Sequence, residues 1–156
     1  MILPGSASQS LAAALAAELD EEVGPVEYDW FADGELIVRA PFDADHAVCI
    51  ASTVSSDAHL QLLQLQDLAR QQADRVTTVV PYMGYARQDR AFKAGEPVSA
   101  RAMARALSTG TDRVLTVTPH EPAVTEFFDV PCEALDGAAL LANPLPADLA
   151  DPLFLA

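Results

Sequence analysis

Lysine is almost missing from this chain of 156 residues. Lys93 is the only lysine among nine basic residues, which stand against 23 acidic ones and leave a formal net charge of −14. A surface of this sign repels nucleic acid and anionic membranes, so neither is an expected partner. It fits a halophilic protein in a high-salt cytoplasm, where screening removes the self-repulsion. An acidic protein without salt adaptation is the simpler alternative.

Long apolar runs and cysteines are scarce as well. No apolar run is long enough to span a membrane, and the first residues, MILPGSAS, lack the basic start and apolar block of a signal peptide. The two cysteines, Cys49 and Cys132, each lie in an apolar, strand-like setting, which favours buried thiols over a disulfide. These absences predict one cytoplasmic domain, since 156 residues can bury one good core.

Apolar runs alternate with helix-like segments along the whole chain. This alternation predicts an α/β fold with a mostly parallel sheet flanked by helices. Strands are expected at Met1–Leu3, Ala47–Ala51, Val76–Val80, Arg113–Val117 and Val130–Ala134. Helices are expected over the apolar positions Leu11, Leu15 and Leu19, over His59–Gln72 behind a cap at Ser55 or Ser56, from Pro97 to a stop at Gly110, and in shorter form over Glu121–Phe128 and Gly137–Ala142.

A β-hairpin is predicted in the part of the chain that lies between the expected strands Met1–Leu3 and Ala47–Ala51. Glu27–Phe31 and Glu35–Arg39 flank Asp33–Gly34, and Asp-Gly between strands is typical of a tight turn with positive φ at both residues. Trp30 and Phe31 then lie at the tip of a projecting β-hairpin. Ordinary aromatic packing is the simplest interpretation of these two rings.

A polar segment follows the strand Val76–Val80, which Pro81 ends because proline has no N–H to give to a sheet. The segment carries Arg87, Gln88, Asp89, Arg90 and Lys93. Arginine offers phosphate a planar fork of donors and lysine adds a point charge, so a polyphosphate site is indicated. In open α/β sheets, ligands bind at this edge. Gln88 can contact a purine-like edge, and Asp89 can hold an arginine or sit near a cation. A solvated loop with a few charges is the alternative.

Other polar residues at strand ends and helix starts are weaker candidates. His120 follows the strand Arg113–Val117, which makes it a candidate for metal or catalytic work, although most such histidines are merely hydrogen bonded. His59 is expected to be a solvated helix residue. Ser52 and Thr53 face a ligand or, more commonly, form a turn.

Four stretches of the chain carry sequence motifs that are more informative than the spacing of their residues. PYMGYARQDRAFKAGEPVSAR at Pro81–Arg101 closely resembles the ATP-binding segment of ribose-phosphate pyrophosphokinases, and FADGE at Phe31–Glu35, TVTPHE at Thr116–Glu121 and EFFDVP at Glu126–Pro131 match in the same order. The resemblance runs from Ile2 to the last residue. It implies that residues 1–156 form the N-terminal, ATP-side half of such an enzyme, with a phosphoribosyltransferase-like fold.

The resemblance also implies roles for particular residues. Phe31 would stack on adenine, reaching in from a neighbouring subunit, while Asp33 and Glu35 help to hold the nucleotide. The ATP would be placed by Arg87, Gln88 and Asp89. His120 would help to hold the Mg²⁺ of Mg–ATP, and Thr118 stands where many family members carry an acidic residue. No catalytic residue is assigned to this half. Homo-oligomers are implied, as dimers that assemble to hexamers.

The activity implied by the resemblance is transfer of the diphosphoryl group of ATP to the C1 hydroxyl of ribose 5-phosphate. The final stretch, DPLFLA at Asp151–Ala156, is expected to begin a strand that leads to a second domain, which carries the ribose 5-phosphate site in the family. This chain alone is therefore expected to bind ATP without turnover and to meet ribose 5-phosphate only with the missing half. A non-catalytic nucleotide-binding or regulatory subunit that pairs with full-length subunits is the alternative.

Overall fold

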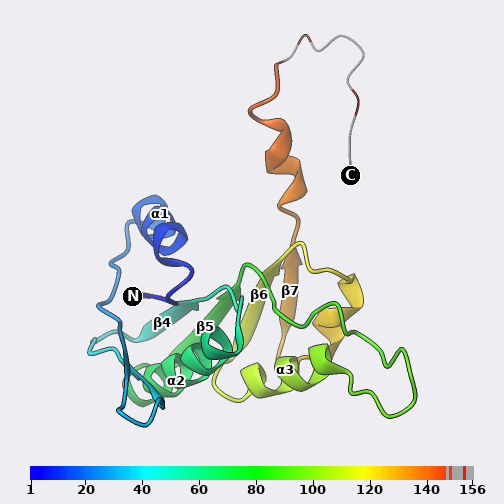
Figure 1. Cartoon of the computed structure of the whole chain (residues 1–156). Helices are drawn as coiled ribbons and strands as arrows, with labels where there is room; N and C mark the ends of the chain where they lie inside the picture. The colour runs from blue at the N-terminus through cyan, green and yellow to red at the C-terminus, as the bar shows by residue number, and fades with distance from the viewer. Residues whose placement is uncertain (147, 149–152, 154–156) are drawn as a thin grey trace.

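A five-stranded sheet forms the centre of the computed structural model, which describes residues 1–146, 148 and 153 (Figure 1). The strand order is β1-β4-β5-β6-β7 and every neighbouring pair is parallel. The strands are β1 (Ile2–Pro4), β4 (His46–Ile50), β5 (Arg75–Val80), β6 (Arg113–Val117) and β7 (Cys132–Leu135). Because all strands run the same way, the segments that follow them meet at one edge of the sheet.

Helices cover the two faces of the sheet unequally. One face carries α1 (Gln9–Leu19), and the other carries α2 (Ser56–Gln72) and α3 (Ser99–Ser108) (Figure 1). Two short 3-10 helices, η1 (Pro122–Phe127) and η2 (Ala138–Ala142), flank β7. The predicted α/β class and its parallel sheet are confirmed.

Alternating side chains along each strand divide the core into two parts. In β5, Val76 and Val80 are fully buried beneath α2 and α3, while Val79 packs toward the other face. Under α1 lies a smaller cluster of Ile2, Ile50 and two alanines. The apolar runs that predicted these strands thus reflect their two buried faces.

The apolar stripe predicted for α1 is wrong at two of its three positions, since only Leu15 packs against the core, and there it is partly buried. Leu11 and Leu19 are 47% and 56% exposed, whereas Ala12 and Ala16 are buried against the sheet. Both sets have the spacing of one helix face, so periodicity alone could not choose between them. The small alanine side chains let α1 lie close to the short strand β1.

The predicted hairpin is present, with β2 (Glu27–Trp30) paired antiparallel to β3 (Leu36–Arg39). Its turn differs from the expected one, because Gly34 has φ +89° while Asp33 is not among the positive-φ residues. The backbone N–H of Gly34 donates to Phe31 O (2.9 Å) and that of Phe31 donates to Glu35 O (2.8 Å). This is a longer turn in which only one residue needs glycine's freedom.

Helix boundaries follow the predicted caps in part. Ser55 caps α2, since its Oγ accepts the backbone N–H of Ala58 at 3.1 Å. The helix after Pro97 begins only at Ser99, and the predicted helix Glu121–Phe128 is the 3-10 helix η1. The strand expected from Asp151–Ala156 lies outside the described residues, except for Leu153. No described helix is long and apolar enough to cross a membrane.

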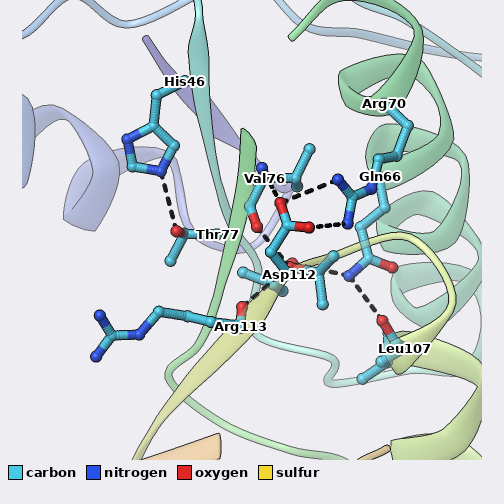
Figure 2. A network of polar contacts seen from close by, with 10 residues as sticks. His46, Gln66, Arg70, Val76, Thr77, Leu107, Asp112 and Arg113 are labelled. Carbon is cyan, nitrogen blue, oxygen red and sulfur yellow. Dashed lines mark hydrogen bonds and ion pairs between the residues drawn. The ribbon is translucent and has the colours of Figure 1, made fainter. Parts of the chain in front are cut away.

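The edge where the strands begin is tied together by polar contacts (Figure 2). Arg70 at the end of α2 donates to both carboxylate oxygens of Asp112, at 2.9 and 2.6 Å, and the backbone N–H of Val76 donates to one of them at 2.8 Å. The Arg70 guanidinium, followed by the Val76 N–H, holds the pKa of Asp112 below its ordinary value. Asp112 thereby joins α2, β5 and the start of β6.

Candidate functional site

The carboxyl edge of the sheet holds a cavity of about 160 Å³ between the segments that follow β5 and β6. Val80 and Thr116 are register partners near the ends of these strands, so the two segments leave the sheet side by side. The cavity is lined by Tyr82, Met83, Ala86, Arg87, Val117, Thr118, Pro119 and His120. The structure therefore brings Arg87 and His120, 33 positions apart in the sequence, to one pocket.

The cations of this edge are free of carboxylate partners. Among the described residues, no ion pair involves Arg87, Arg90 or Lys93. The guanidinium of Arg90 lies 5.2 Å from the centre of the Phe92 ring, a distance typical of a cation–π contact. Asp89, expected to hold a neighbouring arginine, makes no such pair in this part of the chain. Unpaired, solvent-facing guanidinium groups remain available to an anion.

Gln88 organises the loop from within. Its side-chain N–H₂ donates to Arg90 O (3.2 Å), to Glu96 Oε2 (3.3 Å) and to Pro97 O (3.4 Å). Its backbone O also accepts the N–H of Ala100 (3.1 Å) at the start of α3. The predicted contact between Gln88 and a nucleotide stays a prediction, and the amide nitrogen is already engaged in the loop.

Glu96 is a second internal link that the sequence interpretation missed. Its Oε2 accepts the backbone N–H groups of Phe92 and Lys93, both at 3.1 Å, besides the amide of Gln88. One carboxylate thus closes the loop between β5 and α3. The signal was a lone acid directly before Pro97, at the end of a loop whose backbone N–H groups need acceptors.

The loop after β5 is also fixed to the loop after β4 by a residue predicted to form a turn. Thr53 is fully buried, and its Oγ1 accepts the backbone N–H of Gly84 at 3.0 Å. A Cβ on Gly84 would lie 2.2 Å from Thr53 O, so only glycine permits this approach. The first turn of the loop after β5 is therefore held in a fixed position.

His59 was predicted to be solvated, which is wrong. It is 5% exposed, its ring lies 5.5 Å from that of Tyr85, and its buried Nε2 has no hydrogen-bond partner among the residues that the structure describes. Burial lowers the pKa of His59, so the neutral ring is the form that packs here. The helix pattern could not reveal this, because it is the loop around Tyr85 that covers the histidine.

The described residues do not form a resident metal site. No cluster of three or more histidine, cysteine or acidic side chains occurs in the part of the chain that the structure describes. His120 is exposed and contributes a single imidazole, whereas Mg²⁺ prefers oxygen ligands. The predicted role of His120 in holding Mg²⁺ stays a prediction.

The hairpin residues do not line this pocket within one chain. Trp30 and Phe31 are 52% and 51% exposed, and Asp33 Oδ1 accepts the backbone N–H of Glu35 at 3.2 Å. The hairpin packs against α2, where Gln64 exchanges hydrogen bonds with β3. In Figure 1 it hangs in blue beside α2, while the bright green loop before α3 extends on the other side. The structure groups Phe31, Asp33 and Glu35 but does not bring them to Arg87.

Comparison with known proteins finds one family for most of this chain. A family model described as the N-terminal domain of ribose phosphate pyrophosphokinase matches residues 1–110. The ribose-phosphate pyrophosphokinase of Halobacterium salinarum is 63% identical, with 99% of this chain and 56% of that protein covered. The Methanopyrus kandleri protein of the same name is 44% identical over 93% of this chain and 51% of its own length.

A solved structure shows the same fold. The phosphoribosylpyrophosphate synthetase from Mycobacterium smegmatis superposes with a TM-score of 0.77 and 33% sequence identity, covering 92% of this chain and 50% of that one. The chain therefore spans about half the length of the curated relatives that it matches.

Proposed function

The chain belongs to the ribose-phosphate pyrophosphokinase family, and from that premise we propose that it is the half of such an enzyme that holds Mg–ATP. One observation carries the proposal. Arg87 and His120, from successive strand-end segments, line the same pocket, and no carboxylate within the described residues pairs with that arginine. A site so arranged attracts a polyphosphate, because a guanidinium can donate two parallel hydrogen bonds to phosphate oxygens.

The size of the pocket indicates which part of the nucleotide it takes. A cavity of about 160 Å³ is smaller than typical pockets for whole drug-sized ligands, which run to about 300–1,000 Å³. It suits the phosphate chain, with Arg87 on the phosphates and His120 beside the magnesium that they carry. The adenine then lies outside the pocket, near Gln88 and Asp89, where a second group has to cover it.

We propose that Phe31 of a neighbouring subunit is that group, with Asp33 and Glu35 of the same hairpin beside it. The ring is half exposed at a hairpin tip and does not line its own chain's pocket, so it is available to another copy. A base stacked on an aromatic ring gains about 1–3 kcal/mol. A homo-oligomer would thus build each nucleotide site from two chains.

The whole enzyme's reaction is part of the same proposal. The C1 oxygen of ribose 5-phosphate bonds to the β-phosphorus of ATP, and the bond from that phosphorus to the bridging α–β oxygen breaks. AMP leaves with that oxygen, and the proton of the C1 hydroxyl passes to solvent. Such transfers depend on positioning and charge neutralisation. This chain's residues hold the donor, and the sugar requires a second half.

A cytoplasmic, salt-rich setting completes the proposal. It rests on two free cysteines, one buried and one half-buried, and on the net charge of −14. The alternative, a regulatory subunit, uses the same nucleotide pocket, and turnover in the presence of a second half separates the two.

Calorimetric titration with Mg–ATP tests the proposal through Arg87→Ala. We expect the affinity to fall by about 1.5–3 kcal/mol, the scale of hydrogen bonds to a charged group. Arg105→Ala is the matched control, because it removes the same charge from an exposed position at the far end of α3. Equal affinities of the two variants would show that the loop is only solvated surface.

A further inference from the structure

Two residues at the carboxyl edge have a backbone conformation that side chains rarely adopt. Tyr85 has φ 64° and Thr118 has φ 41°, both in the left-handed region. For a β-branched residue such as Thr118 this is an outlier, because Cβ crowds the backbone. Asp20, the remaining non-glycine residue of this kind among those described, ends α1, where a left-handed residue is ordinary.

Both strained residues stand two positions before a side chain that lines the pocket. Tyr85 precedes Arg87 in the loop after β5, and Thr118 precedes His120 in the segment after β6. A left-handed residue reverses the local course of the chain, so it determines where the next residues point. Strain of this kind persists only where neighbouring groups hold it.

Tyr85 is held by α2 and by its own loop. Its hydroxyl lies 2.9 Å from Ser56 Oγ, and its ring packs on the buried ring of His59. Its carbonyl accepts the backbone N–H of Gln88 at 3.0 Å. The turn that carries Arg87 is therefore anchored on both sides.

Thr118 is held by the chain around the end of β7. Its backbone N–H donates to Leu135 O at 2.8 Å, and its Oγ1 accepts the backbone N–H of Gly137 at 3.0 Å. A Cβ on Gly137 would lie 2.9 Å from Val117 Cγ1, so the two segments approach closely. The hydroxyl of Thr118 therefore has a structural partner, in a position where the side chain also lines the pocket.

We propose that Tyr85 and Thr118 are positioning residues, whose strained backbones aim Arg87 and His120 into one pocket. The proposal rests on the proposed function, since it assigns the strain to the nucleotide site. It goes beyond that function in one respect. The nucleotide affinity depends on the contacts that hold the turns at Tyr85 and Thr118, and not only on the groups that touch the ligand.

Two substitutions at Thr118 distinguish the effect of its hydrogen bond to Gly137 from the effect of its left-handed backbone. Thr118→Val keeps the β-branched shape and loses the acceptor for Gly137, so the turn can relax. Thr118→Asn supplies a side-chain oxygen and tolerates the left-handed region better than threonine does. Thr109→Val is the matched control, because it loses a hydrogen bond from Thr109 Oγ1 to Ala106 O (2.7 Å) at the opposite edge of the sheet.

Titration with Mg–ATP and thermal unfolding of the same samples form the first test. We expect Thr118→Val to raise the Kd about three- to tenfold, the loss of one hydrogen bond, and Thr118→Asn to stay within about twofold of the unmodified chain. Thr109→Val should leave the Kd unchanged while lowering the Tm as much as Thr118→Val does. An unchanged Kd in Thr118→Val, or a Kd that tracks the Tm in all variants, would overturn the proposal.

The ring signals of His120 in an NMR spectrum form the second test, which needs no nucleotide. The chain has three histidines, so their signals can be assigned one by one. Thr118→Val should move the His120 signals toward those of a free histidine and leave His46 unchanged. Signals of His120 that do not move would overturn the positioning role, whether or not ATP binds. Absent ATP binding with the expected shift would refute the proposed function alone.

Discussion

The two edges of the central sheet use their charged groups in different ways. At the edge where the strands begin, Arg70 pairs with Asp112, Arg113 with Glu133, and the N-terminal amine with Glu21. These are three of the four ion pairs among the described residues, and none lies at the edge where the strands end. There, Arg87 remains unpaired beside a pocket.

The two edges of the sheet also differ in backbone strain. The left-handed residues Tyr85 and Thr118 both lie at the carboxyl edge. One edge stabilises the fold with satisfied groups, while the other has unpaired charge and strained turns, where the proposed nucleotide site lies. Substitutions at the first edge should therefore change stability, and those at the second should change binding.

The largest expected effect concerns turnover. Neither edge offers a phosphate loop for ribose 5-phosphate, since the sequence has no acidic pair followed by a Thr-Gly-Gly-Thr type of loop. Alignment of two substrates can be worth about 7–11 kcal/mol of barrier. Residues 1–156 alone should therefore form no measurable AMP from ATP and ribose 5-phosphate in an assay with magnesium and high salt.

Adding a separately expressed second half is the positive control for that assay, and it should restore some activity if the two domains dock. Robust formation of AMP and phosphoribosyl pyrophosphate by the short chain would mean that the sugar site lies at one of the two edges described here.

The next effect concerns the hairpin, which belongs to neither edge within one chain. Phe31→Ala should weaken Mg–ATP binding by roughly 1–3 kcal/mol if the ring stacks on the base of a neighbour's nucleotide. Trp30→Ala is the matched control, since Trp30 is as exposed and is the adjacent residue. Calorimetry on assembled protein gives both values.

Mixing the two kinds of subunit sharpens this prediction. An assembly of Phe31→Ala and Arg87→Ala chains should contain some intact sites and recover part of the binding capacity. No recovery in an assembly shown to contain both chains would contradict a site shared between subunits.

Removing the carboxylate of Asp112 tests the stabilising edge. Asp112→Asn should lower the free energy of unfolding by about 1–2 kcal/mol, a modest value because both partners are partly solvated. Urea titration measures it, with Asp67→Asn on the exposed face of α2 as the control. A loss no greater than in the control would show that the network of Figure 2 contributes little.

The smallest effect is a pH dependence with a contribution from each edge. Burial lowers the pKa of His46 at one edge, with help from Arg75, and the pKa of His59 near the other. Below the ordinary histidine pKa of about 6.5, these two histidines bind protons in the unfolded chain more readily than in the folded chain. The free energy of unfolding is therefore not reduced by them above pH 6.5, and it falls as the pH drops below that value.

Urea titrations between pH 8 and pH 5 measure this slope. His46→Gln and His59→Gln should each remove part of it, and the double variant most of it. A double variant that keeps the full slope would assign the dependence to other groups.

The sequence predicted the sheet, its flanking helices and the location of Arg87 and His120 at strand ends, because apolar periodicity follows burial directly. It could not predict how loops close over one another. His59 was misjudged because Tyr85 covers it from another segment. Thr53 was named as a turn residue, but its hydrogen bond to Gly84 could not be predicted because the two residues are 31 positions apart.

Turns and small residues account for the remaining errors. Leu11 and Ala12 mark two helix faces of equal period, and only the close approach of α1 to the sheet decides between them. The strain at Thr118 leaves no trace in composition, since threonine is an ordinary residue at the end of a strand. Whether Phe31, Asp33 and Glu35 meet a nucleotide stays a prediction.

The most direct test of the account measures two quantities on two variants. Arg87→Ala and Asp112→Asn each remove one charge, from opposite edges of the same sheet, and each sample is assayed for its Mg–ATP affinity and its free energy of unfolding. The account predicts a crossed result: Arg87→Ala binds more weakly by about 1.5–3 kcal/mol at unchanged stability, and Asp112→Asn is less stable at unchanged affinity. Losses of both quantities in both variants would contradict the division of the sheet into a stabilising edge and a binding edge.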